Sequence, residues 1–355
     1  MKIGIITINS QNMGNRLQNY AVQQVLQKLG HQVETLNNSY CGREVTTLKH
    51  TLKICVTGRT FPGLFEKRRE GFKHFNDNYI NMNERLWSPD KAPSGIEDEF
   101  DYFICGSDQI WNPHFDFITG NEFLEFARPE QKIAFAASIG VDEIPKLEEE
   151  RFRKRLHDFK AISVREKSGA HLISKILGRE VPVLMDPTLM LSREEWLKFA
   201  KEPKELPIRK YLLTYFLGQK SNDTLDFIQK TAKANNLEIV NLWDIKQKRY
   251  FLTNPSEFLF YIANCEMMLT DSFHGVIFSI IMGVSFSVFW RKDKAKNMST
   301  RLETLLGTLK LENHFNTSKT IDESLFMQDY SEAYEIIQLE KKRSNEYLMN
   351  VIRGD

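Results

Sequence analysis

A histidine at the start of an apolar helical stretch is the first group in this sequence that can do chemistry. Residues 266–269 are typical of a buried strand, and the polar residues Asp271 and Ser272 separate them from the apolar run that contains His274. Ser272 suits the N-cap of a helix, and an imidazole in the first turn can exchange protons near neutral pH. A structural histidine bonded to a carbonyl is the plainer alternative. Asp271 either orients the ring or helps to cap the helix, and the pattern leaves both open.

An arginine follows a second apolar run. Residues 161–164 are typical of a strand, and Arg165 comes where that strand ends and a helix is expected to begin. A guanidinium group carries a rigid fork of donors that matches a carboxylate or a phosphate, so Arg165 suits an anionic ligand. An ion pair with a neighbouring carboxylate is the alternative. Asp186, which precedes Pro187, is as well suited to bracing a turn as to meeting a ligand.

A polar segment, residues 9–16, joins the first predicted strand to the first predicted helix. Open α/β sheets bind ligands at this end of a strand, and helix N-termini favour anions, so Asn15 and Arg16 are candidates for ligand contact, with capping and solvation as the alternative. The segment has one glycine, and neither G-x-G-x-x-G nor G-x-x-x-x-G-K-[ST] occurs. Two more polar loops follow later predicted strands, at residues 106–109 and 138–140.

Composition excludes several classes of protein. The 355 residues hold 48 Lys and Arg against 47 Asp and Glu, and a formal charge of +1 is far from the basic surplus of a nucleic-acid binder. With 41% hydrophobic residues, the chain can build sizeable cores. The histidines lack metal-ligand spacing and no C-x-x-C pair occurs, so we expect no metal, no disulfide framework and a cytoplasmic location. The longest apolar stretch, 276–290, is too short to span a membrane.

The predicted strands alternate with helical patterns. A strand, a helix and a strand within the first 36 residues form a βαβ unit of a parallel sheet. Further strand signals cover residues 101–105, 132–137, 161–164, 181–185, 210–217, 238–242, 266–269 and 285–289. We therefore predict an α/β protein with two Rossmann-like domains, 1–155 and 156–318, and a helical tail over 319–355. An insertion near 41–91 has a basic cluster, Lys67, Arg68, Arg69 and Lys73, which we expect to face water.

Six short motifs occur in order at residues 15–21, 103–112, 136–140, 163–166, 186–188 and 271–275. Together they resemble the polysaccharide pyruvyl transferase family, and the resemblance runs from Lys2 to about Leu311. It implies a fold similar to the B-type glycosyltransferases, with two domains facing a cleft. It also implies transfer of pyruvate from phosphoenolpyruvate to a sugar as a ketal.

The resemblance further implies roles for single residues. Arg165 would grip the phosphate or carboxylate of the donor, and His274 would act as the acid or base. Lys292 and Lys294 either help to hold the phosphate or form a solvated face. Asn15, Arg16 and the loop at 106–109 would shape the acceptor side in the first domain, and the second domain would hold the donor. The full set of other residues expected at the substrates is Asn15, Arg16, Ser107, Asp108, Gln109, Ser138, Asp271, Ser272 and Arg301.

Three hypotheses for function follow. The first is a cytoplasmic pyruvyl transferase of bacterial surface-polysaccharide assembly, with phosphoenolpyruvate as donor, a glycan or lipid-linked sugar as acceptor, and no cofactor or nucleic-acid partner. The second is a B-type glycosyltransferase that uses a nucleotide sugar, and the third is a non-catalytic member that only binds. Arg165 and His274 together favour an enzyme, because a binding module needs no proton donor. The 41–91 insertion either sets acceptor choice or makes a peripheral contact with a membrane that carries the lipid-linked glycan.

Overall fold

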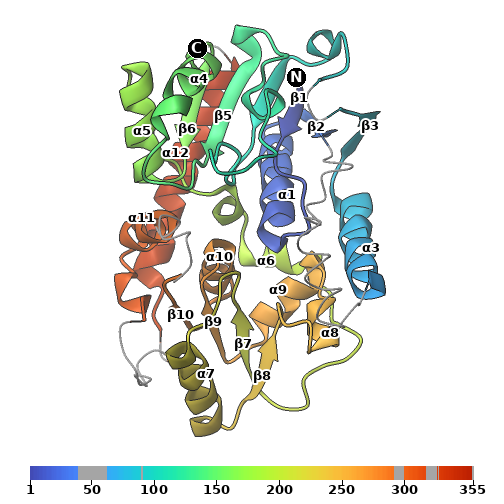
Figure 1. Ribbon diagram of the computed structural model, residues 1–355, viewed down its shortest axis with the longest axis vertical. Helices are drawn as coiled ribbons and strands as arrows, with labels where there is room; N and C mark the ends of the chain where they lie inside the picture. The colour runs from blue at the N-terminus through green and yellow to red at the C-terminus, as the bar shows by residue number, and fades with distance from the viewer. Residues whose placement is uncertain (39–61, 89–90, 292–299, 317–325, 327, 354–355) are drawn as a thin grey trace.

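Two parallel β-sheets, one in each half of the molecule, organise the chain (Figure 1). The computed structural model describes residues 1–38, 62–88, 91–291, 300–316, 326 and 328–353. Within these residues the first sheet has six strands in the order β3-β2-β1-β4-β5-β6, and the second has four in the order β10-β9-β7-β8. All of the strand pairings are parallel, as predicted for two Rossmann-like halves.

The first sheet is built from short apolar runs. Its strands are β1 (Lys2–Ile6), β2 (Gln32–Asn37), β3 (Met82–Leu86), β4 (Tyr102–Cys105), β5 (Lys132–Ala137) and β6 (Ala161–Val164). Its helices are α1 (Met13–Lys28), α3 (Pro62–Tyr79), α4 (Lys146–His157) and α5 (Lys167–Leu177), with short 3₁₀ helices η1 (Ile96–Asp98), η2 (Asn121–Phe123) and η3 (Pro129–Gln131). All of β5 is buried, as expected of a strand covered on both faces.

The strand β6 belongs to the first sheet. The sequence pattern predicts it as the first strand of the second half, but Ile133 and Ala134 of β5 pair with it. The predicted division after residue 155 therefore places this strand on the wrong side. The strand predicted over residues 181–185 is reduced to one isolated bridge from Val183 to Val164. Pro182 explains the loss, because it has no N–H for a ladder.

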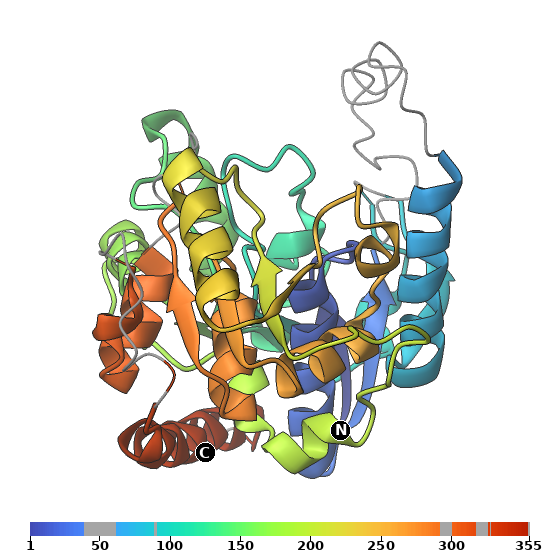
Figure 2. The same ribbon diagram turned by 90° about the horizontal axis from the view of Figure 1, so that it is seen from below.

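The second sheet repeats the pattern with shorter strands. These are β7 (Tyr211–Tyr215), β8 (Glu238–Asn241), β9 (Met267–Thr270) and β10 (Phe286–Val288). The helices of this half are α7 (Asn222–Ala234), α8 (Lys248–Phe251), α9 (Pro255–Ala263), α10 (Phe273–Met282), α11 (Thr300–Leu309) and η6 (Glu312–His314). Successive side chains of β7 enter opposite cores, because Leu212 packs with α7 whereas Leu213 packs with α9 and α10. Figure 2 shows α7 on one face of the sheet and α9 and α10 on the other.

One hydrophobic core runs from β1 of the first sheet to α10 of the second. The connecting elements η4 (Pro187–Met190) and α6 (Arg193–Leu197) lie between the halves, where η4 contacts both α1 and α10. The last helix, α12 (Ser331–Arg353), returns to the first sheet, and the Tyr347 hydroxyl donates to the carbonyl of Ala134 at 3.1 Å. The halves are thus joined by packing as well as by the chain.

The basic cluster of α3 faces water only in part. Three of its members are exposed, but Arg68 is 2% exposed and donates to the carbonyl of Phe251 in α8. Its guanidinium carbon lies 4.9 Å from the ring centroid of Trp243, so α3 anchors on the second half through a buried cation. Residues 41–61 and 89–90 of the predicted insertion lie outside the described residues.

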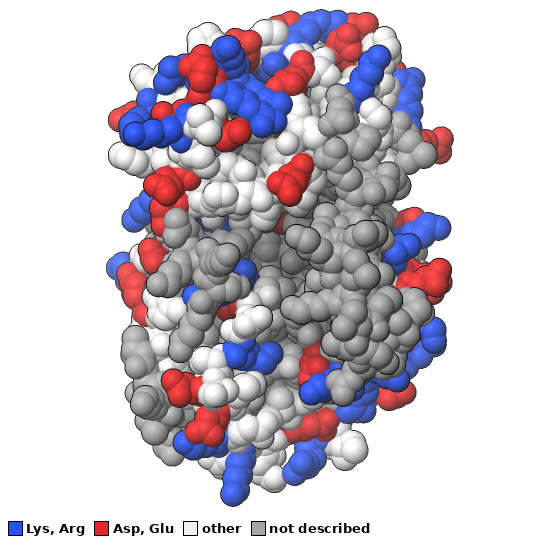
Figure 3. All heavy atoms as spheres, viewed as in Figure 1, with Lys and Arg blue, Asp and Glu red and all other residues white. Residues whose placement is uncertain are grey.

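Charged side chains of both signs are interspersed over the face shown in Figure 3, and the surface is hollowed at mid-height between the two halves. Of the helices that the structure describes, none is both long enough and apolar enough to cross a bilayer.

Candidate active site

His274 stands at the junction of the two halves. The buried strand β9 ends at Thr270, and the Ser272 hydroxyl caps α10 by accepting from the Gly275 N–H at 3.3 Å. The His274 side chain is 7% exposed, and its Nε2 lies 3.7 Å from Oδ2 of Asp186. Among the described residues this Nε2 has no hydrogen-bond partner.

The N-terminus of α1 fixes the other side of the ring. A Cβ built on Gly14 would lie 2.0 Å from the His274 Nδ1, so only glycine leaves room for the imidazole. Asn12 caps this helix by accepting from the Gly14 N–H at 2.9 Å. The ring of the second half is therefore held by the first βα turn of the first half.

Asp186 has two sets of partners. Its Oδ1 caps η4 by accepting from the N–H and hydroxyl of Thr188, at 3.0 and 2.6 Å, so it braces the turn. Its Oδ2 accepts from Arg165 at 2.6 Å and from the Ser107 hydroxyl at 2.8 Å, and it also faces His274. Burial alone would raise the pKa of Asp186, but the His274 ring and the Arg165 guanidinium hold it well below its usual value. The carboxylate is therefore ionised next to the imidazole.

Arg165 is enclosed by carboxylates. Its Nη1 donates to Asp186 and to the Ser107 hydroxyl, the latter at 3.1 Å, and its Nη2 donates to Asp108 at 3.2 Å. The side chain is fully buried, with Oε2 of Glu166 3.9 Å from its Nε. Burial alone would lower the pKa of Arg165, but Asp186, Asp108 and Glu166 together raise it. The ion pair with carboxylates that the sequence leaves open is therefore formed, and Arg165 donates to residues of its own chain.

The two predicted loops form the floor of this network. Asp108 has a φ of 83°, a left-handed conformation that strains a residue with a side chain, and its Oδ1 accepts from the Gln109 N–H at 2.7 Å. The Ser138 N–H donates to the Asp108 carbonyl at 2.9 Å. Glu166 accepts from the N–H groups of Ile139 and Gly140, at 2.8 and 3.1 Å. Ser107, Asp108 and Ser138 are therefore gathered beside Arg165.

Asn15 and Arg16 reach different surroundings. Asn15 donates to Asp108, which brings it into the network. Arg16 is fully buried, donates to the carbonyl of Ile8 at 2.5 Å and to Asn76 of α3 at 3.5 Å, and burial lowers its pKa to about 10. It braces the loop after β1, and Asp108 of the network acts on its charge.

Arg301 is a second buried cation at the same place. Its guanidinium lies 5.5 Å from the ring centroid of Phe273, and the Gln109 amide lies 3.2 and 3.3 Å from its two terminal nitrogens, close enough for the amide oxygen to accept from both. No carboxylate among the described residues forms an ion pair with it, and its Nε lacks a hydrogen-bond partner there. Burial, followed by the nearby Arg165, lowers the pKa of Arg301 to about 9, against the opposing effect of Asp108 and Glu166.

Asp271 takes neither of the roles that the sequence leaves open. Its two oxygens accept from the N–H groups of Leu217 and Gly218, at 2.7 and 2.8 Å, and it pairs with Arg291 at 3.1 Å. It therefore ties the loop after β7 to the start of α10. Lys292 and Lys294 lie outside the described residues.

Sequence reasoning missed Gly14 and left Asp186 out of the site. Gly14 is the one glycine of the polar segment 9–16, and a lone glycine there could have indicated that another group packs closely against the backbone. In the part of the chain that the structure describes, no three His, Cys, Asp or Glu residues are grouped to hold a metal ion, and the expectation of metal-free chemistry stays a prediction.

The motif order and this geometry agree with a comparison against protein families. A sequence model of the polysaccharide pyruvyl transferase family matches residues 12–293. The chain belongs to the polysaccharide pyruvyl transferase family. The segment that matches this transferase family contains Gly14, Arg165, Asp186 and His274, and it ends before Arg301. No curated protein matches the chain.

Solved structures share the architecture of this pyruvyl transferase family member at low identity. A Listeria monocytogenes structure assigned as a UDP-N-acetylglucosamine 2-epimerase is 12% identical, with a TM-score of 0.51 over 99% of this chain and 95% of that one. The UDP-GlcNAc 2-epimerase of Neisseria meningitidis is 9% identical, with a TM-score of 0.48 over 100% of both chains. A glycosyltransferase from Rickettsia africae ESF-5 is 10% identical, with a TM-score of 0.49 over 100% of this chain and 99% of that one. The likeness to the Listeria monocytogenes structure shows the fold alone, which agrees with the two Rossmann-like halves built on the two parallel sheets.

Proposed function

We propose that the protein transfers pyruvate from phosphoenolpyruvate to a sugar of a bacterial surface polysaccharide as a ketal. The observation that carries this proposal is the setting of His274, whose Nε2 lies 3.7 Å from the ionised Asp186 while Gly14 fixes its Nδ1 side. A carboxylate at this distance stabilises the positive charge that the ring gains when it takes up a proton. The arrangement suits a group that gives and takes one proton in each turnover.

Arg301 is the residue that we assign to the donor anion. A buried guanidinium without a carboxylate partner is costly, and a phosphate or carboxylate from the ligand removes that cost. Arg165 has the opposite environment, because Ser107, Asp108 and Asp186 take up its donors. We therefore treat Arg165 as a positioning residue that holds Asp186 against His274.

The chemistry follows from these roles. His274, in its protonated form, gives a proton to the methylene carbon of phosphoenolpyruvate, and the adjacent carbon becomes oxocarbenium-like. A sugar hydroxyl attacks that carbon and returns its proton to His274. The carbon–oxygen bond to phosphate then breaks, and a second hydroxyl closes the ring and passes its proton to the released phosphate. The products are the ketal and inorganic phosphate, and preorganised cations stabilise the phosphate as it leaves.

Thermal unfolding with phosphoenolpyruvate tests the donor assignment. A ligand at 100 times its dissociation constant that binds only the folded state adds about 2.7 kcal/mol to the free energy of unfolding. We expect this stabilisation in the wild type and in His274→Asn, and its loss in Arg301→Met. Lys310→Met, which removes an exposed cation close to the end of α11, is the control and keeps the stabilisation.

Phosphate release tests the transfer step. Phosphoenolpyruvate with methyl glycosides that carry free 4- and 6-hydroxyls should yield inorganic phosphate with the wild type and none with His274→Asn. Stabilisation by a nucleotide sugar such as UDP-N-acetylglucosamine, with no response to phosphoenolpyruvate, would replace this proposal with glycosyl transfer.

A further inference from the structure

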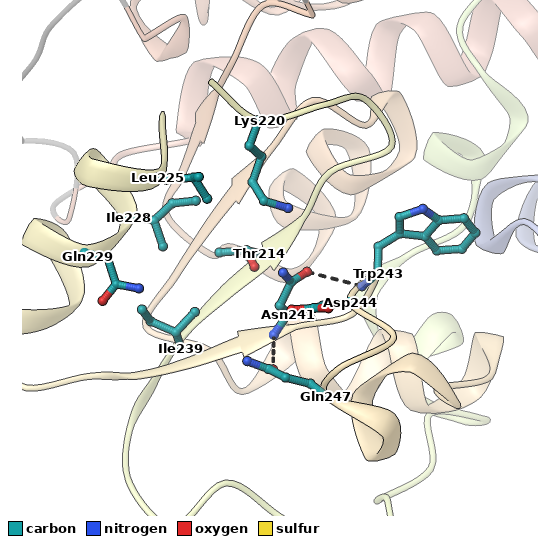
Figure 4. A pocket seen from close by; sticks show the side chains of 10 residues that line it. All are labelled: Thr214, Lys220, Leu225, Ile228, Gln229, Ile239, Asn241, Trp243, Asp244 and Gln247. Atoms are coloured by element: carbon teal, nitrogen blue, oxygen red, sulfur yellow. Dashed lines mark hydrogen bonds between the residues drawn. The ribbon is translucent and has the colours of Figure 1, made fainter. Parts of the chain in front are cut away.

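A pocket of about 340 Å³ opens at the carboxyl ends of β7 and β8, where none of the residues assigned to pyruvyl transfer lie. Figure 4 shows its apolar wall, formed by Leu225, Ile228 and Ile239, on the side away from the indole of Trp243. The remaining lining residues are polar: Thr214, Lys220, Gln229, Asn241, Asp244 and Gln247. Open α/β sheets place ligands at this end of their strands, and the volume suits a small ligand.

The polar lining keeps unused hydrogen-bonding capacity. Asn241 and Gln247 each commit an amide oxygen to a backbone N–H, at 3.3 and 3.1 Å, and within the described residues both NH₂ groups remain able to donate. Asp244 commits one oxygen to the Lys246 N–H at 2.9 Å and has a second oxygen to accept. The pocket therefore offers several donors and an acceptor within one small volume.

Trp243 is a fixed aromatic surface at the edge of the pocket. Its side chain is 40% exposed, so part of the indole meets solvent. The ring is held edge-on to Tyr215, with 6.3 Å between centroids, and lies 6.1 Å from Phe251 and 4.9 Å from the Arg68 guanidinium. Because these contacts set its orientation in advance, a ligand that stacks on it loses little further freedom.

The pocket and His274 are connected by the loop after β7. Asp271, three residues before His274, accepts from the Leu217 and Gly218 N–H groups. Lys220 belongs to the same loop and lines the pocket. The pocket and the start of α10 therefore border the same loop, and the Lys220 ammonium is close enough to interact with both Asp244 and Asp271.

We infer that this pocket binds a pyranose unit of the acceptor glycan, with one sugar face on Trp243 and its hydroxyls on the surrounding amides and Asp244. The inference rests on the proposed function. It moves part of the acceptor to the second half, whereas the family resemblance implies an acceptor side in the first. An apolar ring face beside several hydroxyls matches a sugar, whereas a nucleoside diphosphate needs more cationic donors than the single lysine of this lining.

Saturation-transfer NMR with methyl glycosides of galactose, glucose, mannose and N-acetylglucosamine tests the inference, with UMP as the competing ligand. At least one glycoside should bind the wild type. Trp243→Ala should weaken that binding about tenfold or more, while Trp243→Phe keeps part of it. Gln229→Leu, which leaves the indole in place, should also weaken it. Trp290→Ala is the matched control, because Trp290 is another exposed indole, 46% accessible and stacked on Phe315.

Three results would overturn the inference: no binding of any glycoside, binding that survives in Trp243→Ala, or binding of UMP in place of the sugars. Stabilisation by phosphoenolpyruvate is measured in parallel on the wild type and on Trp243→Ala and should be equal in both. If phosphoenolpyruvate does not stabilise the wild type, the proposed function fails separately from the pocket. Circular dichroism of each variant shows whether it is folded.

Discussion

The surroundings of Arg165 and those of Arg301 differ in charge, although both guanidinium groups lie over the ring of Phe273, at 4.4 and 5.5 Å from its centroid. Around Arg165 the chain supplies Asp108, Asp186 and Glu166 within 4 Å. Around Arg301 it supplies the Gln109 amide, while Asp108 and Glu166 act on the Arg301 charge without forming an ion pair with it. The carboxylates therefore outweigh burial at Arg165, whose pKa is raised, but not at Arg301, whose pKa is lowered.

The difference shows which part of the site is complete without a ligand. A buried ion pair in good geometry holds its partners in place, whereas a buried charge without an opposite charge favours any anion that reaches it. Under the proposed function, Arg165 belongs to the scaffold that orients Asp186 and His274, and Arg301 to the surface that an anionic donor completes.

The largest effect that separates the two regions is expected from Arg165→Met. This change leaves Asp108 and Asp186 buried without their main cation, and we expect the free energy of unfolding to fall by about 3–5 kcal/mol. Urea unfolding followed by circular dichroism measures it. Arg343→Met, at an exposed pair with Glu340, should cost less than about 1 kcal/mol. If Arg165→Met lowers the free energy of unfolding no more than Arg343→Met does, the carboxylates around Arg165 do not depend on it, and the difference between the two regions is not supported.

Gly14→Ala moves the imidazole while leaving both arginines unchanged. A Cβ placed 2.0 Å from the His274 Nδ1 must displace the ring, and a displacement of about 1 Å lowers the rate of phosphate release about 100-fold. We also expect about 1–3 kcal/mol of destabilisation from overpacking. Steady-state phosphate release and urea unfolding measure the two effects.

Gly63→Ala is the matched control for this prediction. It lies in the first turn of α3, and nothing lies within 4 Å of a Cβ built there. It should leave the rate unchanged and stabilise slightly, because alanine has the higher helix propensity. Full activity in Gly14→Ala would show that the ring position does not matter for the reaction.

Much of the fold could be predicted from the sequence, because most of its strands are short apolar runs in a repeated alternation with helices. The errors came from pairing. The pattern over residues 161–164 shows a strand but not which sheet it joins, since that depends on where the α4 crossover returns. The basic cluster around Arg68 predicts a solvated helix face. Arg68 is buried only because α3 packs on the second half of the molecule.

The sequence predicts several residues that the structure brings together, but not the contacts that they make. Asn15, Asp108, Arg165 and His274 are expected near substrates, which stays a prediction, and the structure joins them in one network. Whether an arginine is neutralised depends on carboxylates far away in sequence, and no local pattern reports them. The contact of Asp271 with the loop after β7 likewise joins residues that are far apart in the sequence, so no local pattern predicts it.

The dependence of the free energy of unfolding on pH tests the ion pair between Arg165 and Asp186. The pKa of Asp186 is lowered by His274 and Arg165 against the effect of burial, so it lies below the value of about 3.9 for a free aspartate. Its contribution to stability is complete above that pH and is lost as the pH falls through the folded value. Asp186→Asn should therefore make the free energy of unfolding fall less steeply below about pH 4. Asp226→Asn, on the exposed surface of α7, should show the same slope of the free energy of unfolding against pH as the wild type. An equal change of slope in both variants would show that Asp186 is not the source of the acid dependence.

The smallest effect is expected at Arg301 without a ligand. Arg301→Met removes a buried guanidinium that forms no ion pair with a described carboxylate, and the cost of burying that charge offsets the loss of its contact with Gln109. We expect the free energy of unfolding to change by less than about 1 kcal/mol, in either direction, in urea titrations without phosphoenolpyruvate. A loss as large as that of Arg165→Met would mean that the chain already supplies the counter-charge of Arg301. The two regions would then be equivalent, and the donor anion would have to be held elsewhere.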